Sequence, residues 1–130
     1  MIPADLSITA TASSPQVSAQ GAKGLLSLSG ESYPENSFEF FGPILAWVTG
    51  FLAAGDRPLT VELRLTYLNT SSIKCMMDLL DALEEAHLSG RTVTVNWFYD
   101  QENDRALDLA EEFKEELSLP FTILPVAQAG

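Results

Sequence analysis

The most constraining feature of the sequence is a pair of segments in which apolar and polar residues alternate, with a helix-like segment between them. Residues 59–67 have the sequence LTVELRLTY and residues 93–97 have the sequence VTVNW. Such alternation is typical of strands with one buried and one solvated face. The segment from Ile73 to His87 has helical spacing and is followed by Gly90, a residue suited to end a helix. Together they predict a right-handed parallel strand–helix–strand crossover.

Further strands and helices are predicted on both sides of this crossover. Short strands are expected near residues 6–11, at Val17 and at 24–30, and they should pair antiparallel because the turns between them leave no room for a helix. Helices are expected over 38–52 and 102–117, and a last strand over 119–124.

The alternation also predicts the layers of the fold. Strands buried on both faces would show continuous apolar runs, so helices should cover only one face of the sheet. We therefore expect an α/β two-layer sandwich, a mixed β-sheet with helices packed mainly on one face. Its length favours one domain, residues 1–130, with N-terminal strands in 1–30 and a core α/β unit in 31–125.

The predicted helix over 38–52 carries more apolar residues than a single sheet contact needs. Asn36 and Ser37 are candidate N-caps, and Pro43 would either kink the helix or mark its true beginning. One apolar stripe consists of Phe38, Phe41, Leu45, Val48 and Leu52, and a second of Phe40, Ile44, Trp47 and Phe51. One stripe suffices to cover a sheet, so the second is either core or a contact surface for another protein.

Charge and composition exclude several classes of protein. The net charge of −11 disfavours nucleic acid and anionic membranes as partners. The single cysteine excludes an internal disulfide, and the N-terminus lacks the features of a signal peptide. The apolar stretch 38–54 is too short and too interrupted to span a bilayer. We expect a cytoplasmic protein, and whether it forms a homodimer stays open.

No catalytic, metal or cofactor site is expected. Cys75 and His87 would lie roughly 18 Å apart along one helix, too far to form a nucleophile and base pair. His87 is suited to a helix C-terminus, and Cys75 to a small packed residue. The acidic residues of the last helix are interpreted as a solvated face; they are Glu111, Glu112, Glu115 and Glu116. The sequence contains neither a glycine-rich phosphate loop nor a nucleophile elbow.

The segment YLNTSSIK, residues 67–74, lies where the first strand of the crossover gives way to its helix. Any of the four residues 69–72 could cap that helix, and capping alone is one interpretation of the segment, although one cap does not need four hydrogen-bonding side chains. Free N–H groups and the positive end of the helix suit a phosphate here, and Lys74 is one turn away. A phosphate would add about −1.5 to −2 charges. It could switch partner binding by repelling an acidic surface or blocking an apolar one.

Three segments resemble the SiaC family of bacterial regulatory phosphoproteins. They are SYPENSFEFFG (32–42), YLNTSSIK (67–74) and WFYD (97–100), and the likeness runs from about residue 30 to residue 125. The fold of the family is similar to that of the anti-sigma-factor antagonist (STAS) domains. Asn69-Thr70-Ser71 falls where those domains carry Asp-Ser-Ser, and this alignment selects Thr70 as the phosphorylated residue.

The resemblance implies a non-enzymatic partner-switching protein. A protein Ser/Thr kinase would phosphorylate Thr70 and a PP2C-type phosphatase would reverse the reaction. The unphosphorylated form would bind and activate a diguanylate cyclase, and so promote cyclic-di-GMP signalling and biofilm formation. An anti-sigma-factor antagonist that binds an anti-sigma kinase is the alternative. The partner contacts expected around the switch are Asn69, Ser71, Ser72 and Lys74, together with Tyr33, Glu35 and Asn36.

Overall fold

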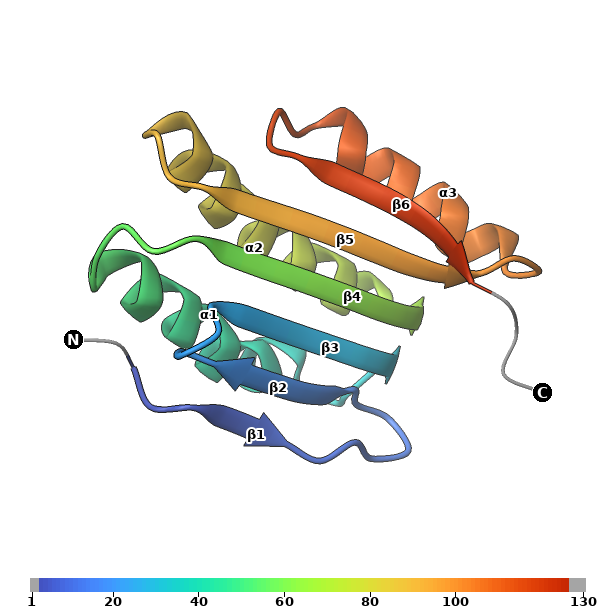
Figure 1. Ribbon diagram of the computed structural model, residues 1–130. Helices are drawn as coiled ribbons and strands as arrows, with labels where there is room; N and C mark the ends of the chain where they lie inside the picture. The colour runs from blue at the N-terminus through green and yellow to red at the C-terminus, as the bar shows by residue number, and fades with distance from the viewer. Residues whose placement is uncertain (1–2, 127–130) are drawn as a thin grey trace.

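The structure, a computed structural model, describes residues 3–126 as one six-stranded sheet with three helices (Figure 1). The elements are β1 (Leu6–Ile8), β2 (Gln16–Gln20), β3 (Leu25–Ser32), α1 (Ser37–Ala53), β4 (Leu59–Leu68), α2 (Thr70–Leu88), β5 (Val93–Asp100), α3 (Asp104–Glu115) and β6 (Phe121–Val126). Residues 1, 2 and 127–130 of the predicted domain lie outside the described residues.

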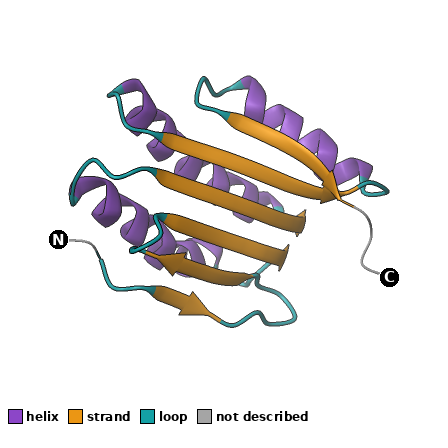
Figure 2. Cartoon of the chain, in the orientation of Figure 1, coloured by secondary structure: helices purple, strands orange, loops and turns teal. Residues whose placement is uncertain are grey.

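The strands occur in the sheet in the same order as in the chain. The neighbours β1–β2 and β2–β3 are antiparallel, whereas β3, β4, β5 and β6 are parallel and joined by the three helices. All three helices lie on one face of the sheet (Figure 2). The predicted mixed sheet, its antiparallel opening strands and the two-layer arrangement are therefore confirmed. No helix among the described residues has both the length and the apolar character that a membrane span requires.

Several element boundaries differ from the predicted ones, and local hydrogen bonds explain most of them. The first strand stops at Ile8, because the chain turns where Thr11 N donates to Ser14 O. Helix α3 begins at Asp104 instead of residue 102, since the Asn103 side chain caps it by accepting from Ala106 N at 3.0 Å. Helix α1 begins at Ser37, so Pro43 lies inside the helix and does not mark its beginning.

The core lies between the sheet and the helices and draws on both apolar stripes of α1. Its largest members from α1 are Phe41, Ile44, Trp47, Val48 and Phe51. Three of these belong to the second stripe, so that stripe is mostly core and not a free contact surface. Phe38 of the first stripe is instead 58% exposed. The buried face lies between the two stripes because α1 packs against α2 as well as against the sheet.

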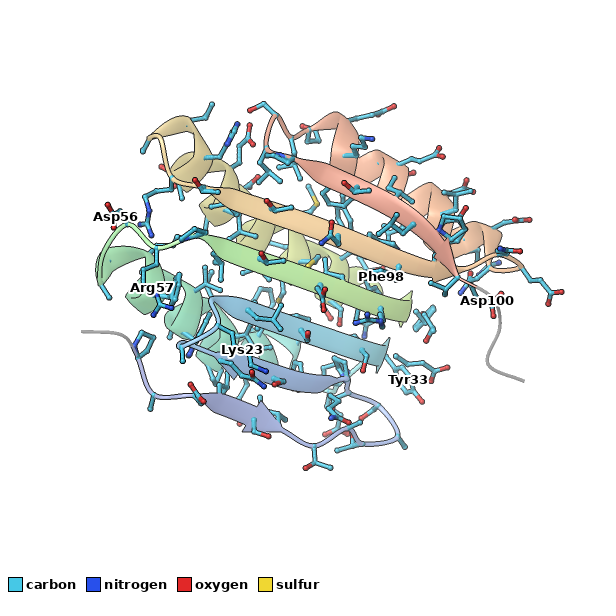
Figure 3. The ribbon with its side chains drawn as sticks, viewed as in Figure 1. Lys23, Tyr33, Asp56, Arg57, Phe98 and Asp100 are labelled. Carbon is cyan, nitrogen blue, oxygen red and sulfur yellow. The ribbon has the colours of Figure 1, made fainter. Side chains whose placement is uncertain are left out.

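The opposite face of the sheet is polar and carries no helix. Ser27, Glu62, Asn96 and Thr122 form one row across β3, β4, β5 and β6. Phe98 lies on the same face, and the Arg64 guanidinium stands 4.2 Å from the centre of its ring (Figure 3). The cation covers one side of the Phe98 ring and so reduces the apolar surface that this face exposes to water.

The last crossover is fixed by a carboxylate on α2. The Glu84 carboxylate accepts hydrogen bonds from the backbone N–H groups of Ser118 and Leu119, at 3.0 Å, and from the Ser118 hydroxyl, at 2.7 Å. These bonds, led by the one from the Ser118 hydroxyl, lower the pKa of the Glu84 carboxyl. They fasten the loop between α3 and β6 to the middle of the molecule.

Candidate functional site

The candidate site lies at the carboxyl edge of the parallel strands. Because α1, α2 and α3 follow β3, β4 and β5, all three helices begin at this edge (Figure 1). Thr70 is the first residue of α2 and is exposed to solvent. Its hydroxyl has no hydrogen-bond partner among the described residues. A modifying enzyme can therefore reach this hydroxyl without opening the core.

Asn69 is the cap of α2, so the cap does not occupy Thr70. The Asn69 side-chain oxygen accepts from Ser72 N at 2.9 Å and from the Ser71 hydroxyl at 3.3 Å. The Asn69 backbone N–H donates to Ser32 O at 2.9 Å, which ties the start of α2 to the end of β3. Thr70 thus stands on a fixed backbone while its own side chain is free.

The charge pattern at the three helix starts singles out α2. The first turn of α1 contains Glu39 and that of α3 contains Asp104, but the first turn of α2 contains no acidic residue. This is notable in a chain with 18 acidic residues. A carboxylate in the first turn would already balance the positive end of the helix. The positive end of α2 therefore has no carboxylate in its first turn, and Lys74 is exposed one turn further on.

Four serine hydroxyls, which we call the serine cluster, join the starts of α1 and α2. They are Ser32 at the end of β3, Ser37 in α1, and Ser71 and Ser72 in α2. The Ser37 and Ser71 oxygens are 2.7 Å apart, those of Ser37 and Ser72 3.2 Å, and those of Ser32 and Ser72 2.8 Å. Buried hydroxyls need such partners. The cluster therefore locks two helix starts and a strand end into one unit.

The expectation that Ser72 contacts a partner is corrected by this geometry. Its exposed fraction is 0%, and its hydroxyl is committed to Ser32 and Ser37. Ser72 positions the first turn of α2 and cannot touch a docking protein directly. Ser71 is half-buried at the rim of the cluster and keeps part of its surface open.

Tyr67 is a surface residue of the site, although the alternation of residues 59–67 predicts it on the buried face with Leu63 and Leu65. The pairing of β4 with β3 skips Thr66, since Gly30 pairs with Leu65 and Glu31 with Tyr67. This bulge reverses the alternation, so that Tyr67 is 48% exposed and Leu68 is buried. The Tyr67 ring meets the Tyr33 ring edge to face, with 6.0 Å between the centroids.

The remaining predicted contact residues lie near this edge but are not all linked to one another. Tyr33 is 41% exposed, and its backbone N–H donates to Ser13 O. Asn36 is exposed and caps α1 by accepting from Glu39 N at 3.0 Å. Glu35 is exposed as well. Neither Glu35 nor Lys74 makes a side-chain hydrogen bond to another predicted contact within the described part of the chain.

The residues considered for catalysis lie in structural positions. Cys75 is buried, and burial, reinforced by the nearby Asp78 carboxylate, raises the pKa of its thiol. His87 lies in the last turn of the same helix, where a cation is favoured. Over residues 3–126, no group of three His, Cys, Asp or Glu side chains is arranged to hold a metal ion.

Removing the Ser72 hydroxyl is expected to destabilise the protein by about 1–3 kcal/mol, because Ser72→Ala leaves the Ser32 hydroxyl buried without its partner. Denaturant unfolding of the variant measures this loss. The double variant Ser32→Ala/Ser72→Ala removes both hydroxyls and should recover part of it. A double variant that is less stable than Ser72→Ala would contradict the role assigned to the cluster.

An exposed hydroxyl on a fixed backbone can carry a regulatory phosphate. The chain belongs to the SiaC family: residues 8–126 match the family described as SiaC family regulatory phosphoprotein. The expectation of a regulatory, non-enzymatic protein is thereby confirmed.

Relatives of known structure agree with this assignment. The chain is similar to SiaC of Pseudomonas aeruginosa, with 53% identity, a TM-score of 0.91, and coverage of 95% of this chain and 100% of that one. It is also similar to the crystal structure of the diguanylate cyclase SiaD in complex with its activator SiaC from P. aeruginosa, with 55% identity, a TM-score of 0.92, and coverage of 94% and 100%. An uncharacterized protein of P. aeruginosa strain UCBPP-PA14 is 56% identical, covering 92% of this chain and 94% of its own length.

Proposed function

We propose that this chain is a phosphoregulated activator of a diguanylate cyclase, with Thr70 as its switch. The main support is the position of Thr70. It is the first residue of α2, its side chain is exposed, and the cap of the helix is Asn69 instead. The first turn of α2 contains no carboxylate. A protein Ser/Thr kinase adds the phosphate and a PP2C-type phosphatase removes it, in the cytoplasm. The description of P. aeruginosa SiaC as the activator of SiaD supports the choice of partner class.

The unphosphorylated surface around Thr70 is suited to bind another protein. Tyr33 and Tyr67 expose aromatic rings there, and aromatic rings are common anchors of protein interfaces. Asn69, Ser71, Lys74, Glu35 and Asn36 supply polar contacts around them. A phosphate on Thr70 would be held locally by the start of α2 and by Lys74, and it would place a dianion in the middle of the docking surface. Partner binding would then be lost without any refolding.

The test is cyclic-di-GMP synthesis by P. aeruginosa SiaD with this chain added as wild type, Thr70→Ala or Thr70→Asp. We expect stimulation by the first two and about tenfold less by Thr70→Asp, since a charge at an interface commonly costs at least about 1.4 kcal/mol. Thr92→Asp is the matched control, because Thr92 is an exposed threonine directly before β5, at the opposite edge of the sheet.

The outcomes separate the parts of the proposal. Equal stimulation by all variants would remove Thr70 as the switch. No stimulation by the wild type would overturn cyclase activation, and capture of an anti-sigma kinase instead would support the anti-sigma-factor antagonist.

A further inference from the structure

A second surface is the groove between α2 and α3, whose floor is the outer edge of the core. Helices α1 and α2 pack closely, whereas α2 and α3 do not. The space between them is a groove of about 330 Å³. Its apolar lining consists of Ile73, Met77, Leu80, Leu109, Phe113 and Leu117. Met77 is 46% exposed at its centre, and methionine adapts well to the side chains of a bound partner.

The rims of this groove are acidic. Asp108, Glu112 and Glu116 follow one another at four-residue spacing from the middle of α3 to its C-cap, and the last two line the groove. Asp81 of α2 stands on the other rim, and no Lys or Arg among the described residues lines this stretch. Like charges at four-residue spacing destabilise a helix, so the fold gains nothing from this row. The groove offers an apolar floor between negative walls.

The groove is continuous with the candidate site. Ile73 lines both this groove and the neighbouring hollow, which reaches Tyr67 and Leu68 at the end of β4. Thr70 lies three residues before Ile73, so a phosphate on Thr70 would stand at the mouth of the groove. Whatever occupies the groove would therefore be affected by the switch.

We infer that the groove binds an amphipathic helix of the cyclase, with an apolar stripe and Lys or Arg on its flanks. This rests on the proposed function. From Leu109 to Glu116 the groove follows α3 and its C-cap for about 10 Å, which accommodates about two turns of a helix. Binding of an apolar helix face in such a groove is a common mode of recognition. The acidic rims select basic flanks in place of acidic ones.

The orientation of the bound helix follows from the helix ends. Helices α2 and α3 both start at the Thr70 edge, so a helix antiparallel to them has the favourable dipole arrangement. Its negative, C-terminal end would then lie next to Thr70. A phosphate there repels that end, and the basic flanks lie further along the groove beside Glu112 and Glu116. Phosphorylation of Thr70, which would block docking at the carboxyl edge of the sheet, would thus also weaken the binding of the helix in the groove.

The test compares two double variants with the same change in charge. Glu112→Lys/Glu116→Lys reverses the rim, whereas Glu111→Lys/Glu115→Lys alters exposed residues of α3 that do not line the groove. The affinity of each for P. aeruginosa SiaD is measured by calorimetry, after circular dichroism has confirmed the fold. We expect the rim pair to weaken binding about tenfold or more and the control pair less than about threefold.

A second comparison tests the apolar floor. Met77→Glu should weaken SiaD binding by a similar factor, while Leu88→Glu, at a 71% exposed position at the end of the same helix, should not. Equal effects of the two double variants, or unchanged binding by Met77→Glu, would overturn the groove assignment while leaving the Thr70 switch standing. A wild type that does not bind SiaD at all would instead overturn the proposed function, and this inference with it.

Discussion

Replacing Trp97 by alanine is expected to lower the free energy of unfolding by about 3–5 kcal/mol. Trp97 is 0% exposed on β5, with ring centroids 5.8 Å from Phe113 of α3 and 6.5 Å from Phe121 of β6. The variant would leave a cavity under α3 and loosen one wall of the groove. Because the Trp97 indole N–H has no hydrogen-bond partner in the described structure, Trp97→Phe should cost much less.

The control for Trp97 is its neighbour on the same strand. Phe98 points to the open face of the sheet and is only half-buried. Phe98→Ala removes the contact with Arg64 and should cost about 1–2 kcal/mol. Urea unfolding of the three variants measures the ranking. If Phe98→Ala proves as damaging as Trp97→Ala, the assignment of the core to one face of the sheet is wrong.

Replacing Gly24 by alanine is expected to destabilise the protein by about 3 kcal/mol or more. Gly24 lies just before β3 with a φ of 60°, and a Cβ atom there would stand 2.3 Å from the backbone oxygen of Pro58. The Gly24 carbonyl oxygen also accepts from Thr60 N at 2.8 Å. The new methyl group must therefore push apart two backbones that are hydrogen-bonded to each other.

Two other glycines allow the energetic cost of backbone strain to be distinguished from the cost of a steric clash. Gly90 has a φ of 97° but open space around its Cβ position, so Gly90→Ala should cost about 1–2 kcal/mol from strain alone. Gly55 has open space and no positive φ, so Gly55→Ala should stay within about 0.5 kcal/mol of wild type. Thermal unfolding of the three variants gives the order. A Gly24→Ala variant as stable as Gly90→Ala would show that the approach to Pro58 is not tight.

The sheet could be predicted well from the sequence, because the alternation of a strand is visible in neighbouring residues. The prediction failed where pairing with another strand changes that alternation. Tyr67 continued the apolar positions of β4, but the bulge opposite Gly30 and Glu31 turned it outward. The bulge depends on the register with β3, more than thirty residues away. Likewise, the buried face of α1 could not be chosen from its two stripes, because the choice depends on how α2 packs beside it.

The same limit applies to the candidate site: features formed by neighbouring residues could be predicted, and contacts between distant residues could not. The polar segment 69–72 could be found from the sequence, because a helix start and its polar residues are adjacent in the chain, whereas the choice of Thr70 within it rests on the resemblance to the family. The contact between Ser32 and Ser72 joins residues 40 positions apart, so nothing local marked Ser72 as buried. The four glutamates at the end of α3, residues 111, 112, 115 and 116, appeared equivalent in the sequence. Only the position of α2 distinguishes Glu112 and Glu116, on the groove, from Glu111 and Glu115.

The two outer strands of the sheet restrict how other proteins can recognise this fold. One border is β1, with three residues, and the other is β6, which contains Pro125. A short border strand and a proline both disfavour addition of a foreign strand. Recognition through side chains is then favoured over recognition through backbone hydrogen bonds at the borders of the sheet. Surface substitutions can therefore retarget the protein during evolution while its backbone hydrogen bonds stay as they are.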